Sequence, residues 1–111
     1  MVNNGVTLVD NYGAYAPLPP GSSYYHTAAN TAGHQVKASP GVFYGLSVNT
    51  AGLTSSVTIY DGTSTGGAVV GVYSTLAQGG PVGPANGIAF LTGLYIVAAG
   101  GTAADITVLY I

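Results

Sequence analysis

The chain has 111 residues, which is enough for one domain with a single hydrophobic core. Hydrophobic residues make up 48% of it, whereas charged residues make up only 4%, far below the roughly 25% of an average globular protein. A single lysine and no arginine argue against nucleic-acid binding, because neutralised phosphates supply most of that affinity.

Residues 1–23 are expected to form an extended, proline-rich arm that precedes a domain of residues 24–111. Pro17, Pro19 and Pro20 lack a backbone N–H and fix φ, so this segment cannot lie in a central strand. The N-terminal sequence has neither the basic nor the apolar region of a signal peptide, and no stretch is apolar for long enough to cross a bilayer. We therefore expect a protein that is made in the cytoplasm and does not associate with membranes.

Eight later segments are strand-like, and in residues 42–48, 57–60 and 105–111 the side chains alternate with a period of two, as in strands that bury one face. Turn-forming residues separate the segments, for example at residues 30–33, and no segment has the spacing of an amphipathic helix. The pattern predicts an all-β fold, either an antiparallel β-sandwich or a small jelly-roll barrel of about eight short strands. The expected strands lie within residues 24–27, 35–38, 42–48, 57–60, 68–75, 87–91, 94–99 and 105–111.

The most regular part of this pattern lies at the centre of the chain. Residues 42–48 and 57–60 are expected to pair as an antiparallel hairpin across a polar turn. Gly71, inside the next strand, predicts a bulge or a close contact. Residues 78–86 are rich in proline and glycine and are expected to form the longest loop, and Thr92-Gly93 to form a tight hairpin or a kink.

Three residue patterns could carry catalysis or bind a metal, and each has a simpler interpretation. The G-x-S-x-G sequence around Ser64 would need a following helix and a later histidine, but a strand follows and both histidines precede it. A hairpin turn at residues 62–67, between the strands expected on either side, is the simpler interpretation. His26 and His34 supply only two of the three or four ligands of a metal site, and we expect them in exposed loops. Asp61 and Asp105 could act as an acid–base pair, but aspartates beside turns commonly bond their own backbone. We therefore expect no enzymatic activity, no metal and no cofactor.

The nine tyrosines give more information about binding. Five fall within predicted strands, where they fit as cross-strand and core-edge side chains; these are Tyr44, Tyr60, Tyr73, Tyr95 and Tyr110. Aromatic residues on an uncharged arm are typical of protein interfaces, and sugar stacking is less favoured because no tryptophan and few amides accompany them. The residues expected to bind a partner are Tyr12, Tyr15, Leu18, Tyr24 and Tyr25.

From Gly41 onward, the sequences GVFYGLSVNTAG, SSVTIYDGTS and LTGLYIVAAGGTAADITVLYI resemble small β-rich virion proteins of tailed bacteriophages, which include capsid decoration (cement) proteins. The resemblance covers residues 41–111 and leaves out the arm. It implies a β-sandwich or jelly-roll that is usually trimeric, sits between capsid subunits and lacks catalytic residues. It contains no residue-level motif, so no site residue is carried over from it.

The leading hypothesis is therefore a capsid decoration protein that stabilises a bacteriophage head. Its expected partners are other copies of itself, in a trimer, and the major capsid protein; its expected location is the capsid surface, after assembly in the bacterial cytoplasm. The scarcity of charge supports it, because such a surface is normally covered, although a surface of Thr, Ser, Asn and Gly could also suffice alone. The alternatives are a head-fibre or tail-fibre knob and a non-catalytic carbohydrate-binding module.

Overall fold

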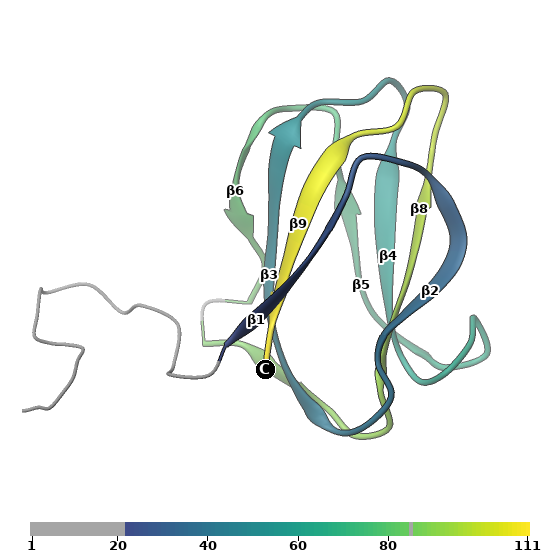
Figure 1. Ribbon diagram of the computed structural model, residues 1–111, viewed down its shortest axis with the longest axis vertical. Helices are drawn as coiled ribbons and strands as arrows, with labels where there is room; N and C mark the ends of the chain where they lie inside the picture. The colour runs from purple at the N-terminus through teal and green to yellow at the C-terminus, as the bar shows by residue number, and fades with distance from the viewer. Residues whose placement is uncertain (1–21, 85) are drawn as a thin grey trace, which may run out of the picture.

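The computed structural model describes residues 22–84 and 86–111, and in these residues it contains nine β-strands and no helix (Figure 1). The strands form two antiparallel sheets that pack face to face. Of the two architectures predicted from the sequence, the β-sandwich is confirmed. The described residues hold no helix that could span a membrane.

One sheet has five strands and faces the viewer in Figure 1. Its order is β1-β9-β3-β6, and β7 also pairs with β3 at the end of β3 opposite to β6. The longest strand, β3, therefore joins three neighbours. The strands are β1 (Ser23–Thr27), β3 (Gly41–Thr50), β6 (Gly79–Val82), β7 (Ile88–Phe90) and β9 (Asp105–Tyr110).

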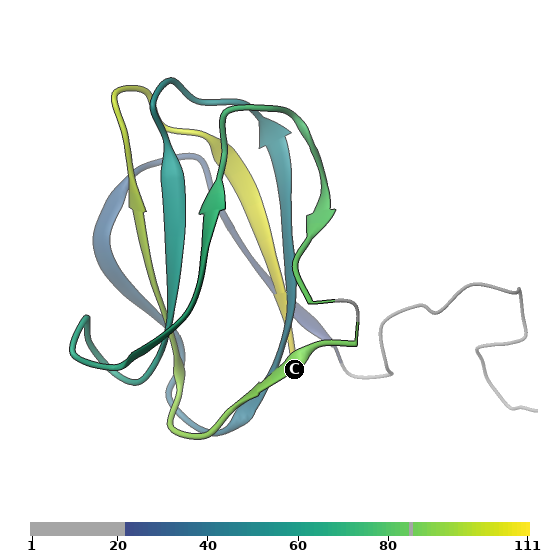
Figure 2. The ribbon, with the colours of Figure 1, turned by 180° about the vertical axis from the view of Figure 1, so that it is seen from behind.

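The other sheet has four strands in the order β2-β8-β4-β5 and faces the viewer in Figure 2. In both sheets every pairing is antiparallel. Among the described strands, β5 pairs only with β4, so one edge of β5 is open. The strands are β2 (Thr31–Lys37), β4 (Ser56–Asp61), β5 (Ala68–Ser74) and β8 (Leu94–Ala99).

The core lies between the sheets, and the period-2 alternation of each strand explains which side chains enter it. In β9, for example, Ile106 and Val108 are buried, whereas Asp105 and Thr107 lie on the opposite face of the strand. Apolar burial of this kind contributes about 1.5–3 kcal/mol for each large side chain. The core residues are Phe43, Leu46, Val48, Val57, Ile59, Phe90, Leu94, Ile96, Ala98, Ala104, Ile106 and Val108.

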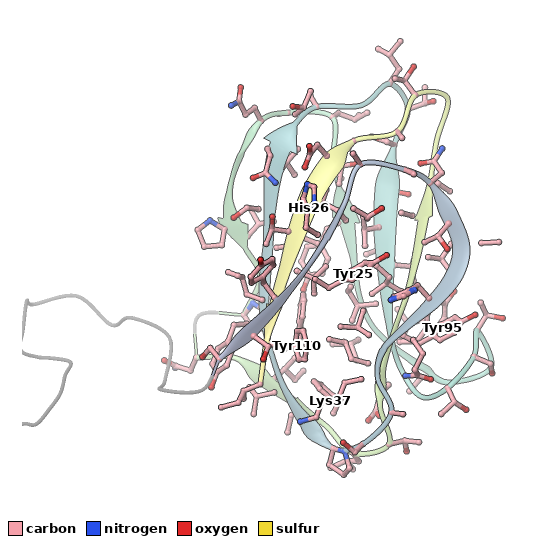
Figure 3. All side chains as sticks on the ribbon, in the orientation of Figure 1. Tyr25, His26, Lys37, Tyr95 and Tyr110 are labelled. Atoms are coloured by element: carbon pink, nitrogen blue, oxygen red, sulfur yellow. The ribbon has the colours of Figure 1, made fainter. Side chains whose placement is uncertain are left out.

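Aromatic contacts between the sheets close the two sides of the sandwich. On the side of β1 and β2, the rings of Tyr25 and His34 stack with centroids 4.2 Å apart. Figure 3 labels Tyr25 between the two strands. On the other side, Phe43 of β3 and Tyr73 of β5 contact each other at 5.9 Å. Each pair joins a strand of one sheet to a strand of the other, so both help to set the spacing of the layers.

The predicted central hairpin is wrong. Residues 42–48 and 57–60 do lie in strands, but β3 belongs to the five-stranded sheet and β4 to the four-stranded sheet. The chain crosses between the sheets over residues 51–55, where Gly52 N–H donates to the carbonyl of Thr75 at 3.0 Å. Alternation gives both strands an inward face, and that face is satisfied equally well by partners in different sheets.

Three smaller predictions are also wrong. The turn expected at residues 30–33 is mostly strand, because β2 begins at Thr31. The loop expected over residues 78–86 contains β6. Thr92-Gly93 is neither a tight hairpin nor a kink in one strand, because it joins β7 and β8, which lie in different sheets.

Strand β6 exists because glycine lets two backbones approach closely. Gly45 of β3 has a φ of 113°, a conformation that favours glycine. A Cβ at this position would lie 2.3 Å from the carbonyl oxygen of Val82 in β6. A composition that normally marks a loop therefore forms a short edge strand against β3.

Other sequence predictions are confirmed. Strands β4 and β5 form a hairpin across residues 62–67. The pairing of β4 with β5 shifts register between Ile59 and Tyr60, opposite Gly71 and Val69, which is the bulge expected near Gly71.

Candidate binding surfaces

The residues predicted to bind a partner occupy different environments. Tyr12, Tyr15 and Leu18 lie outside the described residues. Tyr24 projects from β1 and is 70% exposed, so its ring is available at the surface. Tyr25 points inward, packs against the core and stacks on His34, so its ring is already used inside the domain.

The histidines and Ser64 do not come together. Ser64 lies in the β4–β5 turn, where its hydroxyl accepts a hydrogen bond from Gly66 N–H and its carbonyl accepts one from Gly67 N–H. His26 lies in β1, as the strand expected at residues 24–27 implies, and His34 lies in β2, so the interpretation of both as loop histidines is wrong. The serine thus organises a hairpin turn.

Asp61 and Asp105 lie in opposite sheets and at opposite ends of the sandwich. Asp61 pairs with Leu94, the first residue of β8, whereas Asp105 follows the connection at the far end of that strand. Asp61 bonds backbone, as expected of an aspartate beside a turn, but not the backbone of its own turn. Its carboxylate accepts hydrogen bonds from the N–H groups of Leu91 and Thr92, both at 2.8 Å, and from Gly93 at 3.3 Å.

These donors determine the ionisation of Asp61. The N–H groups of Leu91 and Thr92 stabilise the charged carboxylate and hold the pKa of Asp61 below its ordinary value. Asp61 therefore anchors the turn between β7 and β8 as an anion, which is a structural role.

The outer face of the four-stranded sheet carries an uncharged and largely apolar patch. Two rows of directly paired residues cross it: Val72, Thr58 and Val97 in one, and Val69, Tyr60 and Tyr95 in the other. Val69 and Val72 are 58% and 63% exposed, and the rings of Tyr60 and Tyr95 meet edge to face with centroids 6.3 Å apart. We call these six residues the apolar face.

The apolar face continues to an unprotected strand edge. Strand β5 presents its open edge beside Val69 and Val72, and its seven residues, AVVGVYS, include neither a charged residue nor a proline. Natural edge strands are usually protected by charges, prolines or covering segments, because an open edge can pair with another chain. The bulge at Gly71 is the one protective feature of β5.

The outer face of the five-stranded sheet is different, because it carries a polar cluster of four side chains from three strands. His26 of β1 donates from Nε2 to Oδ1 of Asp105 in β9 over 2.6 Å. The amide of Asn49 in β3 donates to the same Oδ1 at 3.1 Å and to Oγ1 of Thr107 at 3.0 Å. Figure 3 shows His26 lying over β9.

The cluster is ordered but still open to solvent. The side-chain hydrogen bonds from Asn49 and from His26 hold the pKa of Asp105 below its ordinary value, so the carboxylate is charged at neutral pH. The side chain of His26 is 49% exposed and that of Asp105 is 32% exposed. Sequence reasoning missed this cluster, although alternation along β9 does place Asp105 and Thr107 on one face.

No group of three or more His, Cys, Asp or Glu side chains in the described part of the chain could hold a metal ion. The chain matches no protein-family model, no curated protein and no solved structure.

Proposed function

We propose that this protein is a non-catalytic structural protein of a virion, a capsid decoration protein that forms a homotrimer and binds between subunits of the major capsid protein. The observation that carries the proposal is the apolar face together with the open edge of β5. The assignment to a bacteriophage head depends on the sequence resemblance described above.

The apolar face suits association with a protein. Six paired side chains form a continuous surface without a charge, and charged residues are depleted at the centre of protein interfaces. Val69 and Val72 are more than half exposed, so covering them would contribute about 1–2 kcal/mol each. Further stabilisation would come from hydrogen bonds to the backbone of β5, whose other edge no described strand occupies.

A closed ring of subunits is an arrangement that uses these features without uncontrolled growth. An open strand edge that pairs head to tail continues indefinitely unless the rotation between copies closes a ring. A trimer closes with three identical contacts, which also match a site of threefold symmetry among capsid subunits.

Light scattering coupled to size-exclusion chromatography tests the association. We expect three times the monomer mass of 10.9 kDa at tens of micromolar. Val72→Lys, which adds a charge to the apolar face, should yield the monomer mass with unchanged β-rich circular dichroism. Thr63→Lys adds the same charge in the exposed β4–β5 turn and should leave the trimer intact.

Wild-type protein that elutes as a clean monomer under these conditions would remove the support for the proposal. The virion role itself is tested by electron microscopy of particles from cells that produce the protein. Additional density of this size on the outer shell is expected, and particles whose shell lacks it would contradict the capsid assignment.

A further inference from the structure

We propose that the outer face of the five-stranded sheet is a binding site for a neutral oligosaccharide. The polar cluster of His26, Asn49, Asp105 and Thr107 would bind sugar hydroxyls, and the exposed ring of Tyr24 would pack against an adjacent sugar ring. This inference goes beyond the proposed structural function and concerns the opposite face of the sandwich.

The hydrogen-bonding capacity that the cluster leaves unused matches hydroxyl groups. The bonds within the cluster use Oδ1 of Asp105, Nε2 of His26 and the amide nitrogen of Asn49. Oδ2 of Asp105 and Oδ1 of Asn49 have no partner among the described residues, and both can only accept hydrogen bonds. A ligand that satisfies these two acceptors must therefore donate, as the vicinal hydroxyls of a sugar do.

The same groups argue against other ligand classes. An anionic ligand such as a phosphate needs donors and would be repelled by the charged Asp105 carboxylate. A calcium ion needs six to eight oxygen ligands, of which the cluster offers few. A protein partner normally contributes a buried apolar anchor, and the surface suited to one is the apolar face on the other sheet.

The cluster is also preorganised. Its members come from β1, β3 and β9, three adjacent strands of one sheet, and they hold one another in place through the hydrogen bonds described above. A ligand that binds there does not have to immobilise these side chains, and this reduces the entropy cost of binding. The hydrogen bonds from Asn49 and His26 lower the pKa of Asp105, so its carboxylate stays an acceptor to a lower pH than an ordinary aspartate.

Tyr24 supplies the apolar contact that a sugar ring requires. It lies two residues before His26 on β1, so both side chains leave the same face of the strand, roughly 7 Å apart. Its 70% exposure leaves a ring face open to solvent. Tyr24 and the cluster together extend over more than one sugar ring, so the expected ligand is a disaccharide or a longer oligosaccharide.

Amide chemical shifts of the full-length protein in solution test the proposal. The probes are cellobiose, maltotriose, lactose and N,N′-diacetylchitobiose, each titrated to millimolar concentration. At least one should shift the amides of Tyr24, His26 and Asn49 while leaving those of the apolar face unchanged. Tyr24→Ala and Asn49→Ala should each weaken that binding about tenfold or more.

Two variants serve as controls. Tyr24→Phe keeps the ring and should retain binding, and Thr63→Ala, in the exposed β4–β5 turn, should leave it unchanged. Tyr24 and Asn49 are exposed, so their variants should keep the wild-type circular dichroism. If the folded Tyr24→Ala variant binds the sugar more weakly and Tyr24→Phe binds it as well as wild type, the aromatic ring stacks on the sugar.

Three results would overturn the proposal. The first is that none of the four sugars shifts any amide, and the second is that a sugar shifts only amides of another surface. The third is that calcium chloride shifts the amides of the cluster whereas no sugar does. A monomeric protein would refute the proposed assembly without affecting this test, and a protein that binds no sugar could still assemble.

Discussion

Removing the Asp61 carboxylate should release the turn between β7 and β8, and the structure allows the loss of stability to be estimated. Asp61 accepts two hydrogen bonds of 2.8 Å, from Leu91 and Thr92, and a longer one of 3.3 Å from Gly93. Hydrogen bonds to a charged group contribute roughly 1.5–3 kcal/mol each. Leu91 and Thr92 are exposed, so water can replace the hydrogen bonds that their N–H groups would lose. Gly93 is buried, so water cannot readily replace its weaker hydrogen bond.

We therefore expect Asp61→Ala to lower the free energy of unfolding by about 2 kcal/mol. For a domain of this size, this corresponds to a fall in Tm of roughly 8–16 °C. Asp61→Asn keeps one carbonyl acceptor and should lose about half as much. Asp105→Ala removes the same charge but breaks only side-chain hydrogen bonds, so its loss should be smaller.

Urea denaturation at several pH values separates the charge from other effects of the substitution. Because folding lowers the pKa of Asp61, its contribution is fully present above the unfolded pKa of about 3.9 and is lost as the pH falls through the folded value. The difference in stability between wild type and Asp61→Asn should thus be constant above about pH 5 and shrink below about pH 4. Taking this difference cancels the similar titration of Asp105, whose pKa is also lowered.

An Asp61→Ala variant within about 0.5 kcal/mol of wild type would refute this reasoning, because surface substitutions without a structural role fall in that range. A difference between wild type and Asp61→Asn that does not change with pH would also contradict it. That result would mean that the carboxylate is no more stabilised in the folded protein than in the unfolded chain.

Three further predictions concern the core, a buried polar pair and the arm. Phe43→Ala, at a fully buried position, should lower the free energy of unfolding by about 3–5 kcal/mol in urea denaturation. Val72→Ala, at an exposed position, should change it by under about 0.5 kcal/mol. Equal losses of stability in the two variants would contradict the assigned core. Ser55→Ala removes the acceptor of the buried Thr75 hydroxyl and should cost about 1–3 kcal/mol, and an unchanged Tm would show that this hydroxyl finds another partner. Deletion of residues 1–20 should leave the β-rich circular dichroism intact, because every described strand lies outside them. Light scattering should then show that the shortened protein assembles more weakly. An unfolded product would instead mean that the arm is part of the core.

The positions of most strands and their inward faces could be predicted from the sequence. In β9, the alternation that places Ile106 and Val108 inside is a property of a pleated strand and depends on no partner. The hairpin of β4 and β5 was also predictable, because a short glycine-rich turn joins two strands that are neighbours along the chain. The arm residues Tyr12, Tyr15 and Leu18 lie outside the described residues, so their predicted role in binding stays a prediction.

The assignment of strands to sheets could not be predicted. The alternation in β3 and β4 is the same whether they pair with each other or face each other across the core, so the sequence favoured a hairpin that does not form. Strand β6 could not be predicted, because its glycines and proline are typical of a loop. It forms a strand only because Gly45 of β3 lets the two backbones approach closely.

The two outer faces were likewise predictable only in part. Composition alone makes the surface nearly uncharged, since the whole chain has only four charged side chains other than histidine. Where the few polar groups meet depends on the pairing of strands that are distant in the chain. His26 and Asp105 are 79 positions apart in the chain, and their contact exists because β1 and β9 are neighbours in one sheet. Alternation specifies which way a side chain points, but pairing across the sheet, which depends on packing of the whole chain, specifies what it meets.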